Sequence, residues 1–149
     1  MNRVVLRNKK ARRDFYIEDT IEAGIMLFGS EVKSLRDGKA SLSDSFALIE
    51  GREVFLYNCH INPYEFSSSN HEPKRKRKLL LNKREIAKLA IDVSKKSFTL
   101  MPLSVYFKDN RLVKVEIALA KGKKKYDKRE DLKNKVIKAE IDRELKKRR

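Results

Sequence analysis

The sequence predicts a small, mainly β domain that closes on itself as a barrel, with two or three short helices and a strongly basic C-terminal tail. Runs of β-branched and aromatic residues meet at short turns over residues 45–57 and 98–119, which is typical of hairpins. Eleven of the 12 aromatic residues precede Lys121, so only the first part of the 149-residue chain can bury a sizeable core. We therefore expect one barrel domain over residues 1–120 and a tail over 121–149.

The first part of the chain is predicted to form an arm, a strand and a short helix. Residues 1–13 are basic and polar after a short apolar start, and we expect an arm that becomes ordered late or on binding. Residues 15–28 place acidic side chains between apolar ones, which indicates a strand. Ser30 is expected to cap a short helix that ends at Asp37-Gly38.

The middle of the chain reads as a hairpin, a loop and a basic run. Gly51 supplies the positive φ that the turn between the strands of residues 45–57 needs. Residues 62–73 hold two prolines and a polar Ser-Ser-Ser-Asn stretch, which predicts a loop. The basic run 74–78 follows this loop and leads into three leucines.

A helix is predicted to begin after Asn82. Asn82 is a favourable N-cap residue and Glu85 stands at the capping-box position. The two apolar strands after this helix are joined at Asp109-Asn110. Short strands joined by hairpins suit a small barrel that leaves no open edge. The oligonucleotide-binding barrel is the best match by size, and an open α+β sheet is the alternative.

The tail combines high charge with one narrow apolar stripe. Apolar residues recur mostly every fourth position from Leu132 to Leu145, as on one side of a helix. Such a segment is marginal alone, because helix nucleation is unfavourable and the stripe buries little. We expect the tail to be disordered in the free protein and helical when bound.

The charge balance points to a polyanionic partner. Lys and Arg number 37 against 21 Asp and Glu, a formal net charge of +16, and half of the excess lies after Ala120. Such a positive field attracts phosphates and releases their counterions, so nucleic acid is the leading partner class and an anionic membrane surface the second. No apolar run reaches the roughly 18 residues of a spanning helix, and no signal peptide is apparent. We expect a cytoplasmic protein.

No constellation for catalysis, metal or cofactor binding is apparent. The five glycines form no phosphate-binding loop, and a single cysteine rules out an intrachain disulfide. Cys59 and His60 are adjacent, which in a strand directs them to opposite faces, so we expect a buried cysteine and a surface histidine. His71 is expected to be solvated in its loop. Four acidic residues between Asp14 and Glu22 are best interpreted as a solvated strand face.

Aromatic and basic residues together favour RNA. Tyr64 and Phe66 precede the run Lys74–Lys78, and stacking plus phosphate contact is how unpaired bases are held. The alternative for this run is a solvated charged loop or an import-like signal. Further basic patches lie at residues 9–13 and 121–125, and their spacing suggests one extended, shaped RNA.

Distinctive motifs follow one another over more than a hundred residues of the chain. They are Asn8-Lys9-Lys10-Ala11, Glu22-Ala23-Gly24-Ile25, Gly29 to Arg36, Asp44-Ser45-Phe46, Asn62-Pro63-Tyr64-Glu65, Arg75 to Leu81, Ala120 to Lys124 and Asp127-Lys128-Arg129. In this order they resemble the small protein B family, the SsrA-binding proteins of bacteria. Ser97-Phe98-Thr99 and Asp109-Asn110 depart from the usual Gly-Tyr-Thr and Asn-Gly at strand ends.

This resemblance implies a protein that binds the tRNA-like domain of transfer-messenger RNA near its elbow. It would support alanylation of that RNA, with alanyl-tRNA synthetase and elongation factor Tu as partners through the RNA complex. It would then accompany the RNA to stalled ribosomes, where unfinished chains are tagged for degradation. The tail would enter the vacant messenger channel of the small ribosomal subunit as a helix.

The resemblance also assigns candidate site residues. Family recognition positions match at Asn8, Glu22, Leu81 and Lys114, and Leu81 has simple core packing as its alternative role. With the basic residues around them, the expected RNA-contacting set is Asn8, Lys9, Glu22, Lys33, Arg36, Arg75, Arg77, Lys78, Leu81 and Lys114. The expected ribosome-contacting set is Lys121, Lys123, Lys124, Tyr126, Asp127, Lys128 and Arg129.

Two other functions fit the composition. A structural ribosomal protein would carry a similar charge, and it is the main alternative. An RNA-processing enzyme is the third hypothesis, although no residue set predicts its chemistry.

Overall fold

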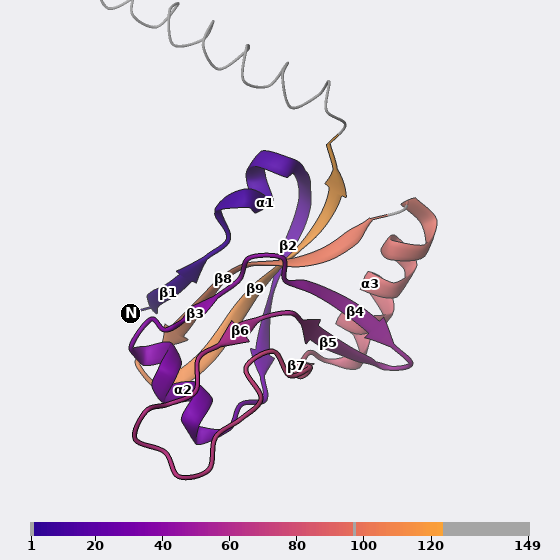
Figure 1. The fold of residues 1–149 in the computed structure, drawn as a ribbon. Helices are drawn as coiled ribbons and strands as arrows, with labels where there is room; N and C mark the ends of the chain where they lie inside the picture. Colours follow the sequence, from indigo (N-terminus) through magenta and orange to yellow (C-terminus); the bar gives the residue numbers. More distant parts are fainter. Residues whose placement is uncertain (1, 97, 124–149) are drawn as a thin grey trace, which may run out of the picture.

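A computed structural model describes residues 2–96 and 98–123, and these residues form a mainly β structure with three helices (Figure 1). The elements follow the chain as β1 (Asn2–Arg7), α1 (Lys9–Asp14), β2 (Phe15–Ile25), α2 (Gly29–Arg36), β3 (Ala40–Ser41), β4 (Phe46–Glu50), β5 (Glu53–Tyr57), β6 (His60–Ile61), β7 (Arg77–Leu80), α3 (Lys83–Lys96), β8 (Thr99–Lys108) and β9 (Leu112–Gly122).

The strand pairings run in a circuit. β8 pairs with β4, β4 with β5, β5 with β7, β7 with β2, β2 with β9, and β9 pairs again with β8, all antiparallel. β1 lies outside this circuit, beside the second half of β8. An open sheet, the alternative considered from the sequence, would leave both edge strands unpaired.

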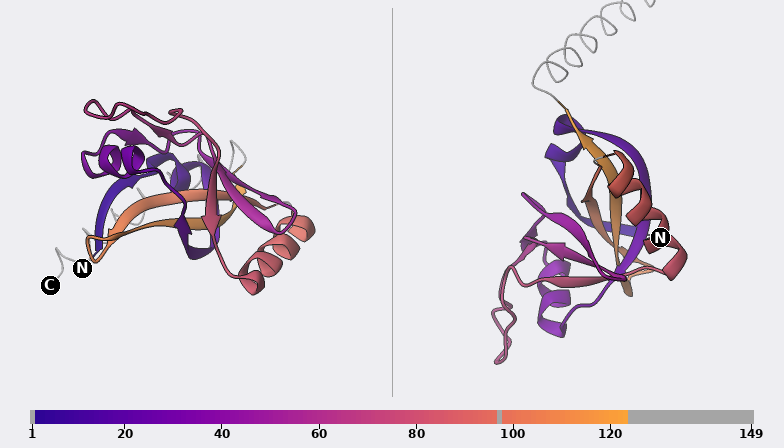
Figure 2. Two further views of the ribbon diagram at one scale, coloured as in Figure 1. Left: turned by 90° about the horizontal axis from the view of Figure 1, so that it is seen from below. Right: turned by 90° about the vertical axis from the view of Figure 1, so that its right-hand side faces the viewer.

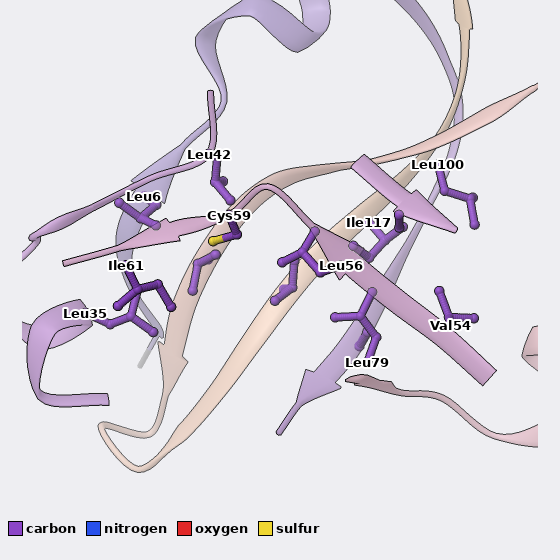
Figure 3. Packing of buried hydrophobic residues seen from close by; sticks show 14 of the residues in the cluster. Leu6, Leu35, Leu42, Val54, Leu56, Cys59, Ile61, Leu79, Leu100 and Ile117 are labelled. Carbon is purple, nitrogen blue, oxygen red and sulfur yellow. The ribbon is translucent and has the colours of Figure 1, made fainter. Parts of the chain in front are cut away.

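The main core lies inside the circuit, where the inward side chains of all six strands meet (Figure 3). Val54, Leu56, Leu79 and Ile117 are at most 1% exposed. Burial of this kind contributes about 25 cal/mol per Å² of apolar surface removed from water. α3 adds Leu89 to the same cluster.

A second, smaller cluster lies on the outer face of β8 and β9. Ala11 of α1 packs there against Met101, Leu103, Ala118 and Ala120. Small alanines on β9 let the short helix α1 lie close to the strand. As a result α1 and the end of β9 share one end of the molecule, and α2 and the loop of residues 62–73 lie at the other (Figures 1 and 2).

Several turns form as predicted. Gly51 has φ +63° in the two-residue turn between Glu50 and Glu53, and Asp109 and Asn110 both have positive φ in the turn that the Arg111 N–H closes onto the Lys108 carbonyl at 3.1 Å. At α3, Asn82 Oδ1 accepts from the Glu85 N–H at 2.9 Å, and Glu85 Oε1 accepts from the Asn82 N–H at 3.0 Å. The capping box is therefore confirmed.

The N-terminal region differs from its prediction. Instead of an arm, residues 2–7 form β1, which pairs with β8, and residues 9–14 form α1. Pairing with β8 buries apolar surface of β1, since Leu6 is 9% exposed and belongs to the main core. A short amphipathic strand next to a basic helix looks in sequence like a charged arm.

The cap of α2 and the setting of His71 also differ. The Phe28 N–H donates to Glu31 Oε1 at 2.8 Å, so Glu31 caps the helix instead of Ser30. Ser30 Oγ instead lies 2.8 Å from Nδ1 of His71, and Nε2 of that ring donates to the Ile61 carbonyl at 2.8 Å. His71 is 8% exposed and fastens its loop to α2, so the expectation of a solvated histidine was wrong.

Candidate nucleic-acid interface

The outer face of β2, β9 and β8 forms a polar strip. The register places Lys114 of β9 beside Gly24 of β2 and Tyr106 of β8, and it places Glu116 of β9 beside Glu22 and Ser104. Successive strand residues point to opposite faces, so these side chains point away from the core that Val115 and Ile117 enter. The strip thus joins two residues expected from the sequence to contact RNA, Glu22 and Lys114, that lie far apart in the chain.

Glu22 is oriented by two donors on β8. The Tyr106 hydroxyl donates to Glu22 Oε2, and Lys108 Nζ lies 3.3 Å from Glu22 Oε1. The hydrogen bond from Tyr106 is the largest cause that lowers the pKa of Glu22, and the charges of Lys108 and Lys114 act in the same direction. Burial and the bond to Glu22 raise the pKa of the Tyr106 phenol. The strip therefore presents an ionised, fixed carboxylate among cations.

Asn8 lies at the corner where β1 meets α1. Its Nδ2 donates to the Pro102 carbonyl at 2.9 Å, and its backbone N–H donates to the Leu103 carbonyl at 2.8 Å. Both bonds fix the corner to β8. Lys9 begins α1 and is exposed.

Arg77 does not reach the surface. Its side chain is 0% exposed and pairs with Glu31, which is also 0% exposed. Its guanidinium also donates to the carbonyls of Cys59 and Pro73. Burial excludes the RNA contact predicted for Arg77, and its role is to join β7 to α2 and the loop of residues 62–73.

Arg75 pairs with the same buried carboxylate, that of Glu31. Its Nη2 lies 2.6 Å from Glu31 Oε1 and 3.2 Å from the Met26 carbonyl, and its guanidinium lies 4.2 Å from the centre of the Phe28 ring. The side chain keeps 23% of its surface exposed. The predicted basic patch 74–78 is therefore divided between the interior and the surface.

The other predicted cations each have a neighbour at the surface. Lys33 Nζ lies 5.4 Å from the Tyr64 ring centre, and Arg36 Nη2 donates to the Asn110 carbonyl at 3.0 Å. Lys78 Nζ lies 3.2 Å from Glu53 Oε1. None of these three side chains pairs with Glu22. The cation that pairs with Glu22 is Lys108.

Of the two neighbouring leucines, Leu80 is more open to solvent than Leu81. Leu81 is half-buried and packs against the main core, which agrees with the core-packing role considered for it as an alternative. Leu80 is 48% exposed and lies across from Gly24 on the polar strip. A Cβ at Gly24 would lie 3.1 Å from Leu80 Cβ, so the bare glycine lets the leucine lie close to β2.

The loop of residues 62–73 carries a pair of packed aromatic rings, one of them exposed. Tyr64 and Phe66 pack edge to face with ring centres 5.6 Å apart, and Phe66 is 80% exposed. Asn70 holds the loop by accepting from the Tyr64 N–H at 2.7 Å and donating to the Tyr64 carbonyl at 3.0 Å.

Two residues of the predicted tail set belong to the described structure. Lys121 is exposed near the end of β9, so the strand runs two residues into the predicted tail. The Lys123 N–H donates to the Asp14 carbonyl at 2.9 Å, and Lys123 Nζ lies 4.7 Å from the Tyr16 ring centre. The remaining members of that set lie outside the described residues: Lys124, Tyr126, Asp127, Lys128 and Arg129.

Tyr106 and Lys108 were not among the RNA contacts expected from the sequence. Tyr106 lies in the apolar strand predicted over residues 98–107 and was counted only as part of it, and Lys108 lies just beyond that strand and was given no role. Strict alternation from Ser104 would have placed Ser104, Tyr106 and Lys108 on one outward face. The bulge between Pro102 and Ser104 hides that alternation in the first half of the strand.

The single cysteine of the chain is buried. Cys59 is 2% exposed, and burial raises the pKa of its thiol to about 11. His60 is half-exposed, as expected of a surface histidine beside a buried cysteine. Within residues 2–96 and 98–123 no three His, Cys, Asp or Glu side chains come together to hold a metal ion, and no helix there is long and apolar enough to span a membrane.

Comparison with known proteins agrees over nearly the whole chain. The family model described as SmpB protein matches residues 5–147. The SsrA-binding protein of Halothermothrix orenii is 56% identical over 147 residues, which cover 98% of this chain and 94% of that protein. The SsrA-binding protein of Geobacter sulfurreducens is 58% identical over 134 residues, which cover 89% of this chain and 87% of that protein.

A solved structure agrees with these relatives. A chain from the structure named "tmRNA-SmpB: a journey to the center of the bacterial ribosome" has 47% sequence identity and a TM-score of 0.68, covering 85% of this chain and 93% of that chain. A family match of this length, together with relatives of this identity, leaves one assignment: the chain belongs to the SmpB protein family.

Proposed function

We propose that this protein binds the tRNA-like domain of transfer-messenger RNA and acts in trans-translation. It supports alanylation of the RNA and delivers it to stalled ribosomes, so that incomplete proteins are tagged for degradation. The observation that carries this proposal is the strip in which Glu22 and Lys114 come together on adjacent strands. The names of the relatives, SsrA-binding protein and tmRNA-SmpB, support the same ligand and the ribosome as its destination.

We further propose that the strand circuit is a barrel of the oligonucleotide-binding type. The support is the return of the pairings from β9 to β8 and the size of the domain. In such a barrel, side chains on the outer strand faces are available to bases and phosphates. This assigns binding to fixed side chains and no bond-making chemistry, so the protein is proposed to be non-enzymatic and to need no cofactor or metal.

The proposed division of labour separates RNA binding from ribosome contact. Residues 1–120 grip the RNA, and residues 121–149 contact the small-subunit decoding region and messenger channel. Elongation factor Tu and alanyl-tRNA synthetase take part through the RNA complex in the cytoplasm. The support is the charge distribution, since the last 29 residues carry 14 basic and 6 acidic side chains.

The direct test is a competition between folded and unshaped RNA. The full chain should bind the tRNA-like domain more tightly than a duplex RNA of equal length at moderate ionic strength. Its affinity should fall by about 0.7–0.9 log units per log unit of salt for each neutralised phosphate. Equal affinity for both RNAs would refute the proposal, and permanent association with vacant ribosomes without transfer-messenger RNA would favour a structural ribosomal protein.

Two variants distinguish RNA binding by residues 1–120 from ribosome contact by residues 121–149. Lys114→Ala should weaken RNA binding by about 1–3 kcal/mol if its phosphate contact is desolvated. Truncation after Lys123 keeps the bond from Lys123 to the Asp14 carbonyl and should leave RNA binding mostly intact while tagging collapses. Normal tagging by the truncated chain would contradict the division of labour.

A further inference from the structure

A cationic cavity of about 240 Å³ lies at the corner of β1 and α1, over the outer face of β8 and β9. The residues that line it are Arg7, Asn8, Lys9, Arg12, Leu103, Ser104 and Glu116. It adjoins the polar strip, since Glu116 stands beside Glu22 in the register, but it opens on the side of α1. Its volume is enough for one nucleobase.

The cavity holds an uncommon carboxylate. Glu22 and Glu116 face each other on neighbouring strands, and like charges directly opposite destabilise a sheet. Glu22 is compensated by Tyr106 and Lys108. Among the residues that the structure describes, Glu116 receives one long hydrogen bond, from Ser104 Oγ at 3.4 Å, and forms no ion pair. The Glu116 carboxylate is partly exposed, its position opposite Glu22 destabilises the sheet, and its oxygens can accept further hydrogen bonds. These features indicate a ligand that donates hydrogen bonds to Glu116.

The surrounding charges define the rest of that ligand. Arg7, Lys9 and Arg12 are exposed, and none of them forms an ion pair with another described residue. Three unpaired cations attract phosphates, whereas a carboxylate repels them and accepts from the N–H groups of a base. The combination of an acidic wall and a cationic rim matches a nucleotide whose base enters and whose backbone stays outside.

The geometry points to guanine, and we propose that this cavity binds one unpaired guanine of the RNA. Guanine presents two adjacent donors on its Watson–Crick edge, N1–H and the N2 amino group, and a carboxylate accepts both at once. Adenine and cytosine offer one amino group beside an acceptor, and uracil offers one N–H between two carbonyls. Arg7, Lys9 and Arg12 then hold the flanking phosphates, as in other sites for single-stranded RNA.

This proposal rests on the proposed function, because it assumes an RNA ligand, and it adds a base-specific contact. Asn8 acts in it as part of the wall, since its Nδ2 is bonded to the Pro102 carbonyl. Glu116 becomes the specificity-determining residue. Glu22 remains the carboxylate of the adjoining strip.

The test uses three pentanucleotides, UUGUU, UUAUU and UUIUU, where I is inosine, which lacks the N2 amino group. Their affinities for the full chain are measured by competition in fluorescence anisotropy, with the tRNA-like domain titrated in parallel. The wild-type protein should bind UUGUU about tenfold more tightly than UUAUU, with UUIUU between them. Glu116→Gln should reduce that preference below twofold and should not weaken the binding of UUAUU, because the substitution removes a charge that repels phosphate.

Two further variants serve as controls. Glu53→Gln removes an exposed carboxylate of β5 that pairs with Lys78, and it should keep the full guanine preference. Arg12→Ala should weaken the binding of all three pentanucleotides by the same factor, because a phosphate contact carries no base information.

The outcomes separate this proposal from the proposed function. If the wild-type chain shows no preference among the pentanucleotides but still selects the tRNA-like domain, only the guanine site is overturned. A preference that survives in Glu116→Gln overturns it as well. If the chain does not select the tRNA-like domain over duplex RNA, the proposed function itself fails. The wild-type comparison of guanine with inosine needs no variant to fold.

Discussion

Tyr106 of β8 donates its phenolic hydrogen to the carboxylate of Glu22 on β2, across a sequence separation of 84 residues. β9 lies between these two strands, so the bond crosses it diagonally, between the positions of Lys114 and Glu116. It fixes one carboxylate oxygen, and Lys108 fixes the other. The orientation of a proposed RNA contact thus depends on a tyrosine that no motif in the sequence singles out.

Removing this bond should weaken RNA binding and change its pH dependence. We expect Tyr106→Phe to cost roughly 1 kcal/mol of binding, below the value for a buried charged hydrogen bond because Glu22 is 39% exposed. The bond lowers the pKa of Glu22, so the wild-type carboxylate stays ionised as the pH falls, and the variant should protonate at a higher pH. Affinity measured between pH 4 and 7 should therefore decline earlier in the variant. Identical profiles would show that Tyr106 does not position Glu22.

Glu31 should control acid stability. Desolvation alone would raise the pKa of Glu31, but hydrogen bonds from Arg75, the Phe28 N–H and Arg77 outweigh it and lower the pKa. A carboxylate with a lowered folded-state pKa stabilises the protein above its ordinary pKa, and this stabilisation is lost as the pH falls through the folded-state value. Glu31→Gln should cost about 3–5 kcal/mol at pH 7, since it leaves Arg77 buried and unpaired.

Urea unfolding at several pH values measures both effects of Glu31. The variant should lose stability at pH 7 and show a flatter dependence between pH 5 and pH 3 than the wild type. Glu53→Gln, which breaks an ion pair whose carboxylate is 49% exposed, should change stability by less than about 1 kcal/mol. A cost for Glu31→Gln as small as that of this control would show that the buried cluster contributes little.

Alanine substitutions at Leu80 and Leu81 should affect different properties, RNA binding in the first case and stability in the second. Leu81→Ala removes apolar contact with the main core and should cost about 1–2 kcal/mol of unfolding free energy, less than a fully buried leucine. Leu80→Ala removes an exposed side chain from the strip, so it should weaken RNA binding and change stability by about 0.5 kcal/mol or less. Thermal unfolding and RNA titration of both variants measure this pair of effects. The reverse pattern would favour Leu81 as the RNA contact, the first role expected for it from the sequence.

Cys59 should be unreactive in the folded protein. Its thiol is 2% exposed and its pKa is raised to about 11 by burial, so little thiolate is present at pH 8. A disulfide reagent such as DTNB should label the native chain slowly and the urea-unfolded chain at the rate of a free thiol. Rapid native labelling at pH 8 would mean that the structure opens easily around Cys59, between β5 and β6.

Local chemistry explains which elements could be predicted from the sequence. The capping box at Asn82 and Glu85 and the turns at Gly51 and Asp109-Asn110 depend on residues within four positions of one another. Each such group satisfies backbone donors or adopts positive φ by itself. The alternation of apolar residues likewise predicted most strands, because one face of each strand must be buried.

Errors arose where a charged or polar side chain is buried by a distant partner. Arg77 and Arg75 belong to one basic run, yet one is fully buried, because Glu31 lies 46 residues away in sequence and beside it in space. His71 and Ser30 meet across 41 residues. A run of charge looks the same in sequence whether solvent or a carboxylate neutralises it, so the burial of these residues could not be predicted.

The sequence alone determined a basic, β-rich chain with an apolar first part, and its motifs indicated the family, because composition, alternation and turn chemistry act over short distances. Only the tertiary structure decided which charges meet: Glu22 with Tyr106 and Lys108, Glu31 with two arginines, and Glu116 with the cationic corner of α1. The physical reason is that strand register and closure set distances between residues tens of positions apart, and electrostatic and hydrogen-bond energies depend on those distances.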